Sequence, residues 1–147
     1  MRNLHNAGVI EELEPDEVDA FLRAQVVGRI GCHAGGETYV VPIIYAWDGE
    51  AAYVLTIEGR KVRMMRENPR VCLEVDEYLG AAGWRSVIVD GVYEELEGDD
   101  AERARELLVE RFGRRRPARG EAQPQAGPEP VAFRIRSVAA TGRRVVR

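Results

Sequence analysis

The segment Thr56-Ile57-Glu58-Gly59-Arg60-Lys61 combines residue types that suit an anionic ligand. The apolar residues before it predict a strand that ends here, and the residues after it predict a short helix. Free N–H groups at a helix N-terminus, the hydroxyl of Thr56 and the charges of Arg60 and Lys61 can converge on one phosphate dianion. On composition alone, the same residues also fit a solvated turn.

Other kinds of catalytic site lack the residues they need. Metal ligands beyond carboxylates are few: His5, His33, Cys32 and Cys72. Cys32 and His33 are adjacent on a predicted strand, so they point to opposite faces and form neither a zinc site nor a Cys-His nucleophile pair. The sequence also contains no Gly-x-Ser-x-Gly elbow, P-loop or dinucleotide fingerprint. We therefore expect no metal site and no hydrolase of these classes.

The positions of these residues depend on a chain that alternates mainly between strand patterns. Periodicity predicts helices after Pro15, between Gly59 and Asn68, and over Asp99–Phe112, where Asp99 or Asp100 can cap the helix. It predicts six strands, at Val26–His33, Thr38–Trp47, Ala51–Ile57, Val71–Asp76, Ser86–Leu96 and Val131–Val138, and a last segment at Thr141–Arg147. Gly35-Gly36 and Asp48-Gly49 predict two tight turns between the first three strands.

These elements predict a mainly β protein with inserted helices. Six short antiparallel strands in 147 residues indicate one domain, a closed or half-open barrel with short helical covers. The stretch 114–130 contains four of the seven prolines and no large apolar side chain, which predicts a mobile loop. Arg114, Arg115, Arg116 and Arg119 in this loop offer a salt-sensitive contact with nucleic acid, but no aromatic residues interleave with them to stack bases. We expect no nucleic-acid partner.

Charge and hydropathy exclude further classes. The net charge is −4, divided into −11 for residues 1–113 and +7 for residues 114–147, so the body of the protein is acidic. The apolar runs are too short to span a bilayer, and the N-terminus lacks an export signal. Cys32 and Cys72 lie in alternating apolar stretches typical of buried, reduced thiols. We expect a cytoplasmic protein with no membrane partner.

Several short segments occur in an order and spacing that resemble a known family. They are Val27-Gly28-Arg29-Ile30, Tyr39-Val40-Val41-Pro42-Ile43-Ile44-Tyr45, Gly59-Arg60-Lys61, Glu67-Asn68-Pro69-Arg70-Val71, Trp84-Arg85-Ser86-Val87, Phe133-Arg134-Ile135 and Thr141-Gly142-Arg143. Together they resemble the FMN-binding split-barrel family typified by pyridoxamine 5'-phosphate oxidase, in the branch related to nitroimidazole-resistance proteins. The resemblance spans most of the chain and implies a split β-barrel with six antiparallel strands and short helices.

The resemblance also implies a cofactor site. FMN would bind at the interface of a homodimer, with its phosphate held by Arg60 and Lys61 after Gly59 and by a hydrogen bond from Thr56. Backbone around Pro42, Ile43 and Ile44 would line the flavin ring, and Trp84, Arg85 and Ser86 would approach it from the next strands. A tryptophan beside an arginine can equally pack as a core aromatic, so both interpretations of Trp84 stay open. A proline within a strand independently indicates a sheet edge or a bulge, because it donates no ladder hydrogen bond.

The implied activity is hydride transfer through the flavin to a small-molecule substrate in the dimer cleft. Relatives vary the ligand, so F420 or haem are alternatives to FMN. The chain ends in Arg143-Arg144-Val145-Val146-Arg147 rather than in the substrate-binding segment of the pyridoxamine phosphate oxidases. It also carries Leu55-Thr56 where nitroimidazole-resistance relatives have a histidine. A flavin-binding or sensing protein without turnover is therefore the alternative function.

Overall fold

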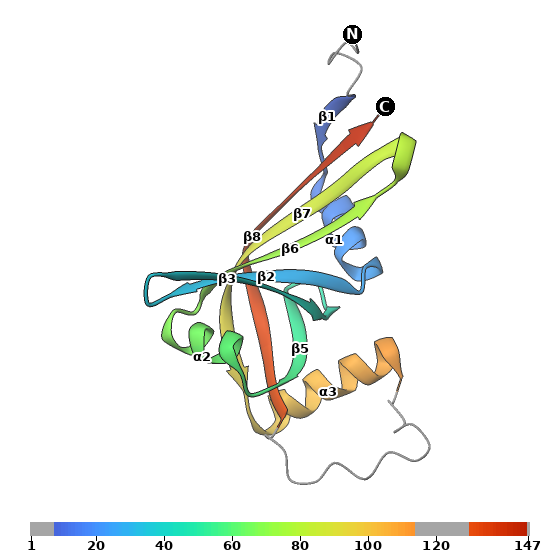
Figure 1. The fold of residues 1–147 in the computed structure, drawn as a ribbon. Coiled ribbons are helices and arrows are strands. Elements are labelled where there is room, and N and C mark those ends of the chain that lie inside the picture. The colour runs from blue at the N-terminus through green and yellow to red at the C-terminus, as the bar shows by residue number, and fades with distance from the viewer. Residues whose placement is uncertain (1–7, 114–129, 147) are drawn as a thin grey trace, which may run out of the picture.

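The computed structural model describes residues 8–113 and 130–146, which form eight strands and three α-helices (Figure 1). The helices are α1 (Pro15–Ala24), α2 (Arg60–Glu67) and α3 (Gly98–Phe112). The strands are β1 (Val9–Glu12), β2 (Val27–Ala34), β3 (Glu37–Ile44), β4 (Ala46–Trp47), β5 (Ala51–Ile57), β6 (Arg70–Tyr78), β7 (Gly83–Leu96) and β8 (Pro130–Val146).

All eight strands belong to one antiparallel sheet. Its order is β3-β2-β6-β7-β8-β5-β4, and β1 pairs with β8 outside this path. The sheet curls into a barrel (Figure 1). Among the described residues, β3 pairs only with β2, so this barrel stays split along β3. The position of Pro42 on this edge strand confirms the expectation that the proline marks a sheet edge.

The longest strands extend beyond the barrel as a twisted arm. β6, β7 and β8 run from the barrel into this arm, where β1 lies against the end of β8 (Figure 1). Helix α1 lies beside the base of the arm, and α3 crosses the opposite end of the barrel (Figure 1). The outer side of the barrel wall and arm, on the strands β3-β2-β6-β7-β8, is not covered by a described helix.

The predicted fold class is confirmed, but the predicted strand number of six is wrong. The sequence pattern missed β1 because all four of its residues are exposed and show no apolar alternation. The single strand predicted over Thr38–Trp47 is divided at Tyr45 into β3 and β4. Tyr45 is fully buried and its hydroxyl donates to the Leu22 carbonyl oxygen at 2.8 Å, so the chain turns there toward α1.

Other element boundaries also differ from the sequence prediction. The two C-terminal segments form the single strand β8, which has one irregularity opposite Asp90 and Gly91. Glu97, rather than Asp99 or Asp100, is the N-cap of α3. The predicted turn at Gly35-Gly36 is confirmed, with φ of 60° and 77°. The loop predicted over 114–130 lies outside the described residues, except that Pro130 begins β8.

The core fills the barrel and continues beneath α1. Its strands alternate between buried and exposed residues, as a half-buried sheet requires. Helix α1 adds Phe21 and Leu22, and α2 adds Val62 and Met65. The fully buried strand residues are Ile30, Ala52, Val54, Leu73, Val75, Val87, Val89, Phe133 and Ile135.

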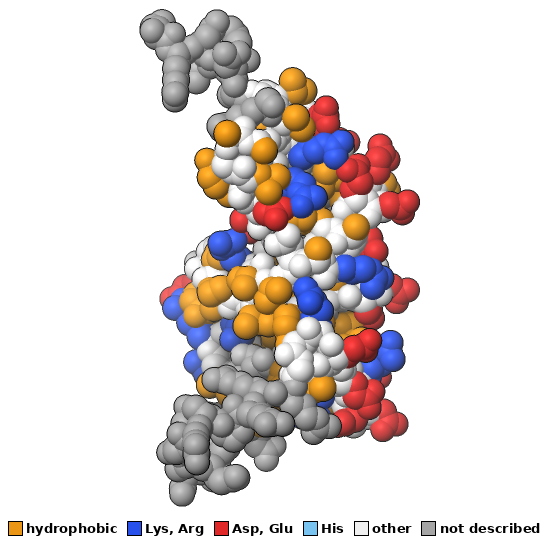
Figure 2. Space-filling model, turned by 90° about the vertical axis from the view of Figure 1, so that its right-hand side faces the viewer, with side chains coloured by type: hydrophobic (Ala, Val, Ile, Leu, Met, Phe, Trp, Pro, Cys, Tyr) orange, Lys and Arg blue, Asp and Glu red, His pale blue; other side chains and the backbone are white. Residues whose placement is uncertain are grey.

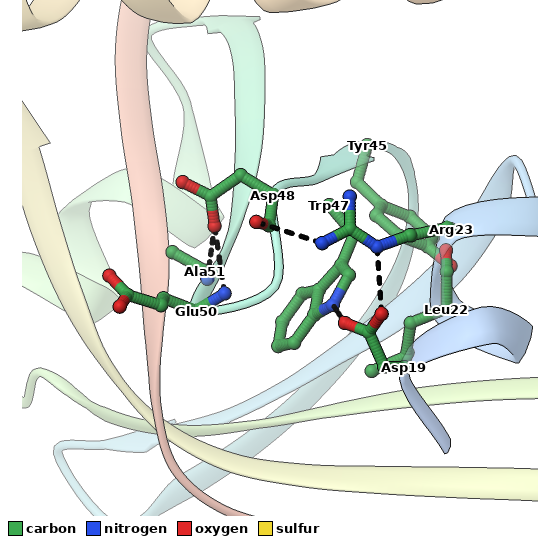
Figure 3. Close-up of polar contacts among 8 residues, drawn as sticks. All are labelled: Asp19, Leu22, Arg23, Tyr45, Trp47, Asp48, Glu50 and Ala51. Atoms are coloured by element: carbon green, nitrogen blue, oxygen red, sulfur yellow. Dashed lines mark hydrogen bonds and ion pairs between the residues drawn. The ribbon is translucent and has the colours of Figure 1, made fainter. Parts of the chain in front are cut away.

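A polar cluster fixes α1 to the turn between β4 and β5 (Figure 3). Asp19 accepts hydrogen bonds from Arg23 Nε at 2.8 Å and from Trp47 Nε1 at 2.9 Å. Arg23 Nη2 also donates to the Asp48 carbonyl oxygen at 3.1 Å. Asp19 is therefore the acceptor through which the helix holds the end of β4, and with it the start of β5.

We expect Asp19→Ala to lower the free energy of unfolding by about 1–3 kcal/mol at neutral pH, because Trp47 and Arg23 lose a shared acceptor. Urea unfolding measures this difference. The hydrogen bonds from Arg23 and Trp47 lower the pKa of Asp19 below its ordinary value of 3.8. The stabilisation is therefore complete above that value and is lost as the pH falls through the lower folded pKa.

The control for this experiment is Glu102→Ala, whose exposed ion pair with Arg105 spans 3.8 Å. It is expected to change stability by less than about 0.5 kcal/mol. A difference between wild type and Asp19→Ala that stays constant down to about pH 2.5 would contradict the role of the ionised carboxylate.

Candidate functional site

The split in the barrel holds a cavity of about 440 Å³. It lies between the C-terminal half of β3 and the C-terminal half of β5, and the first residues of β2 and α2 complete it. This volume is within the range of small-molecule sites. The residues that line it are Val27, Pro42, Ile43, Ile44, Val54, Leu55, Thr56 and Lys61.

Two strand edges border this cavity. β3 is the edge of the sheet, and β5 pairs with β4 only through Ala52 and Tyr53. Within the described residues, Val54–Ile57 therefore have a strand partner, β8, on one side only. Backbone N–H and C=O groups on such edges are available to a ligand. Pro42 contributes no N–H, which also discourages another strand from pairing along β3.

The cavity has a polar end formed by Thr56 and Lys61. Thr56 is the penultimate residue of β5, and Lys61 is the second residue of α2. Both side chains are half-buried. Gly59 is the N-cap of α2 in an extended conformation that any residue can adopt, so the backbone does not require a glycine here. The predicted turn thus brings a hydroxyl, a cation and a helix N-terminus to one end of an apolar cavity.

Arg60 is oriented differently from Lys61. Its Nη2 donates to Glu37 Oε2 at 3.0 Å, and its guanidinium lies 4.4 Å from the centroid of the Tyr39 ring. Arg60 does not line the cavity. Two adjacent cations that the sequence places together therefore have different partners: Lys61 lies at the cavity, and Arg60 ties α2 to β3.

The predicted segment Trp84-Arg85-Ser86 lies three strands away from β3. Pro42 pairs with Arg29, Arg29 with Glu74 and Glu74 with Ile88, so these four residues form one row across the strands β3, β2, β6 and β7. Their side chains therefore lie on the same, outer face of the sheet. Trp84 and Ser86 lie on this same face by alternation along β7. Strand spacing puts Ser86 roughly 14 Å from Ile44.

Arg85 points to the opposite face of β7. Its guanidinium lies 4.9 Å from the centroid of the Phe21 ring, and its Nη2 donates to Glu77 Oε2 at 2.5 Å. These contacts pack Arg85 between the arm and α1. The structure therefore separates the predicted site residues into those that line the cavity, Pro42, Ile43, Ile44, Thr56 and Lys61, and those that do not, Gly59, Arg60, Trp84, Arg85 and Ser86.

Sequence reasoning missed three apolar residues of the cavity, Val27, Val54 and Leu55. Val27 is the Cα partner of Ile44, and Ile44 is 56% exposed although it lies in a predicted strand. Figure 2 shows a patch of exposed hydrophobic side chains at mid-height on one side of the molecule, bordered by Lys and Arg. The sequence signal for these residues was the run of consecutive apolar residues in β3 and β5, which places apolar side chains on both faces of each strand. The sequence does not show which of these side chains are exposed, because that depends on the split in the barrel.

A charged network lies beside the turn, on the other side of α2. Arg66 binds Glu95 through Nε at 2.7 Å and Nη2 at 3.1 Å, and binds Glu58 through Nη1 at 2.5 Å. The hydrogen bonds from Arg66, and then from Tyr93, hold the pKa of Glu95 below its ordinary range. Burial is the main cause that raises the pKa of Tyr93. Nothing in the sequence indicated that these residues meet.

A larger hollow of about 810 Å³ lies at the other end of β2, near Gly31, Cys72 and Asp90. Burial raises the pKa of the Cys72 thiol, and Asp90 and Glu74 raise it further, so this cysteine is a poor nucleophile at neutral pH. Both cysteines are free. Among the described residues, no group of three or more His, Cys, Asp or Glu side chains could hold a metal ion.

Comparisons with known proteins agree with this architecture. The sequence profile of the pyridoxamine 5'-phosphate oxidase family matches residues 14–144. The chain belongs to the pyridoxamine 5'-phosphate oxidase family. This family assignment confirms the resemblance that the sequence motifs suggested.

Two relatives of this pyridoxamine 5'-phosphate oxidase family member share about one third of its residues over the aligned regions. A FAD-binding protein from Mesorhizobium loti is 32% identical, with a TM-score of 0.76 over 95% of this chain and 99% of that chain. An uncharacterized protein of Rhizobium meliloti (strain 1021) is 33% identical over 87 residues, which are 59% of this chain and 58% of that protein. This chain thus matches a little over half the length of that relative.

Two more distant structures share the fold alone. A candidate 5-nitroimidazole antibiotic resistance protein from Bacteroides thetaiotaomicron is 14% identical, with a TM-score of 0.72 over 92% of this chain and 87% of that chain. A heme-binding protein from Mycobacterium smegmatis is 17% identical, with a TM-score of 0.64 over 87% of this chain and 53% of that chain.

In the described part of the chain, no helix is long and apolar enough to cross a membrane.

Proposed function

We propose that this protein binds FMN in the cavity between β3 and β5 and acts as a flavin-dependent oxidoreductase on a small-molecule substrate. One observation carries the proposal. Thr56 and Lys61 form the polar end of a cavity whose other walls are apolar and whose borders are two strand edges. A flat aromatic ring system that has a polar rim and is linked to a phosphate monoester has the matching chemistry.

The residues of the cavity divide into two roles. Lys61 and Thr56, together with N–H groups at the start of α2, would bind the phosphate. Pro42, Ile43 and Ile44 would pack against the ring, and Val54 and Leu55 would exclude water from its other edge. Backbone groups on the β3 edge would hydrogen-bond the polar rim of the ring. The FAD-binding relative from Mesorhizobium loti supports a flavin of this general kind.

A bound flavin supplies hydride transfer through its N5 atom. The side chains that line the cavity include one titratable group, Lys61, at the phosphate end. In this proposal, the protein's role is to orient the ring and exclude water, and the substrate binds in the cleft of a homodimer. The same observation favours the second candidate function, which is flavin binding without turnover.

We further propose that the site is completed in a cytoplasmic homodimer. The outer face exposes apolar residues on neighbouring strands, including Val27, Val40, Ile44 and Ile88. Exposed apolar area of this kind marks a contact surface. Packing two outer faces about a twofold axis would let Trp84 and Ser86 of the partner subunit approach the ring from the side opposite Ile44.

Purified protein tests the cofactor directly. We expect a yellow solution with flavin absorbance, or the appearance of bound flavin when FMN is added to colourless protein. The mass of the released cofactor distinguishes FMN from FAD, F420 and haem. FAD is included because the Mesorhizobium loti relative is an FAD-binding protein. Reduction by NADH or NADPH under anaerobic conditions separates turnover from simple binding. Protein that binds no flavin would contradict the proposal.

Lys61→Ala is expected to weaken FMN binding by about 1.5–3 kcal/mol, roughly 10- to 150-fold in Kd, because one charge-assisted bond to the phosphate is lost. Arg60→Ala is the matched control. Arg60 binds Glu37 and Tyr39 outside the cavity, so its loss is expected to cost less than about 1 kcal/mol. Quenching of flavin fluorescence measures both. A larger effect at Arg60 than at Lys61 would reverse the assignment of the phosphate cation.

If the protein is a homodimer, light scattering is expected to give a molecular mass of twice the 16.4 kDa of the chain. Ile88→Glu places a charge on the outer face, where Ile88 is 44% exposed, and is expected to shift the mass toward the monomer. Val109→Glu is the control, because Val109 is 39% exposed on α3, away from that face. A wild-type mass of 16.4 kDa would contradict the dimer.

A further inference from the structure

Arg66, in the last turn of α2, connects the turn that precedes its own helix to β7, 29 residues away from it in the sequence. The Arg66 guanidinium donates hydrogen bonds to both carboxylate oxygens of Glu95 on β7, at 2.7 and 3.1 Å. Oε1 of Glu58 accepts a third at 2.5 Å. The Tyr93 hydroxyl also donates to Glu95 Oε1, at 2.6 Å, and further fixes that carboxylate. A planar guanidinium fills this arrangement, whereas a lysine ammonium cannot bind Glu95 in a fork and reach Glu58 as well.

The position of Glu58 gives this network its importance. Glu58 directly precedes Gly59, the N-cap of α2, and lies three residues before Lys61. Its Oε2 is shielded from solvent and accepts no hydrogen bond from the described residues, so Arg66 is the cation that neutralises it there. The turn that carries Lys61 is thereby attached to β7 in the middle of the sheet.

Arg66 and Lys61 lie on different sides of the turn. Arg66, Glu58 and Glu95 line a separate hollow that also includes Arg105, whereas Thr56 and Lys61 line the cavity at the split. Arg66 therefore does not line the proposed phosphate site. Its influence on a ligand there would be transmitted through the backbone of Glu58–Lys61.

We propose that Arg66 is a positioning residue, which holds the Glu58–Lys61 turn at the distance from β5 that lets Thr56 and Lys61 bind the same phosphate monoester. This inference rests on the proposed flavin site and assigns it a support that lies outside the cavity. Without the guanidinium, the carboxylates of Glu58 and Glu95 repel each other, and the turn moves away from β7. Displacement of binding groups by a fraction of an ångström weakens a site that depends on their convergence.

The experiment compares the affinities for FMN and riboflavin, which differ by the phosphate alone. Arg66→Ala is expected to raise the Kd for FMN about tenfold or more and to leave the Kd for riboflavin within about twofold. Arg66→Lys is expected to restore little, because the forked geometry is lost. Glu58→Gln is expected to weaken FMN binding in the same way, and the double variant Arg66→Ala/Glu58→Gln to be no worse than Arg66→Ala.

Arg134→Ala provides the matched control. Arg134 Nε binds Glu94 Oε1 at 2.9 Å across β7 and β8, an ion pair of similar exposure that does not involve the turn. It is expected to change neither affinity. Thermal unfolding of each variant shows whether it is folded. If Arg66→Ala does not fold, Glu95→Gln, which keeps Arg66 and Glu58, replaces it in the comparison of the FMN and riboflavin affinities.

Two results would overturn the inference. An unchanged ratio of FMN to riboflavin affinity in Arg66→Ala, including an equal loss of both, would mean that Arg66 contributes only general stability. Wild-type protein that binds riboflavin as tightly as FMN would remove the phosphate site itself, and the proposed function would fail together with the inference. The wild-type measurement thus separates the two failures.

Discussion

The unclosed seam between β3 and β5 is the constraint on which the rest of the structure depends. Strand edges carry N–H and C=O groups that a closed barrel would pair internally. Here the described part of β3 has no second strand partner, and Tyr45 turns the chain toward α1 instead of extending β3 along β5. The cavity exists because these two edges are held apart, and Pro42 removes one donor from the exposed edge.

Charged groups hold both ends of β5, one of the two strands that border this seam. Asp19 joins α1 to the end of β4, and Arg66 joins the turn before α2 to β7. Exposed ion pairs contribute little individually, but a guanidinium shared by two carboxylates fixes both of them in position. Both clusters attach a connecting segment to a rigid element, and both segments lead into β5 or out of it. The β5 edge of the cavity is thus positioned from outside it.

Sheet register determines which predicted residues can act together. Pro42 and Arg29 are Cα partners, and the same row continues through Glu74 to Ile88. Alternation then places Trp84 and Ser86 on the outer face and turns Arg85 toward Phe21. Three consecutive residues that look like one motif in the sequence therefore have two different environments. The apolar outer face is also the surface through which we propose that a second copy completes the site.

The sequence by itself determined the local features, because these depend on interactions between residues close along the chain. The Glu14 N–H donates to Glu17 at the start of α1, two glycines form the hairpin between β2 and β3, and Asn68-Pro69 ends α2. The family motifs likewise identified the fold class, and local pattern predicted the end of the strand that carries Thr56 and the start of the helix that carries Lys61. Tertiary structure alone decided that Arg60 binds Glu37, that Tyr45 divides a strand and that Arg66 meets Glu95. These partners are 23 to 29 residues apart, and their meeting is set by strand register and sheet curvature, which no local pattern encodes.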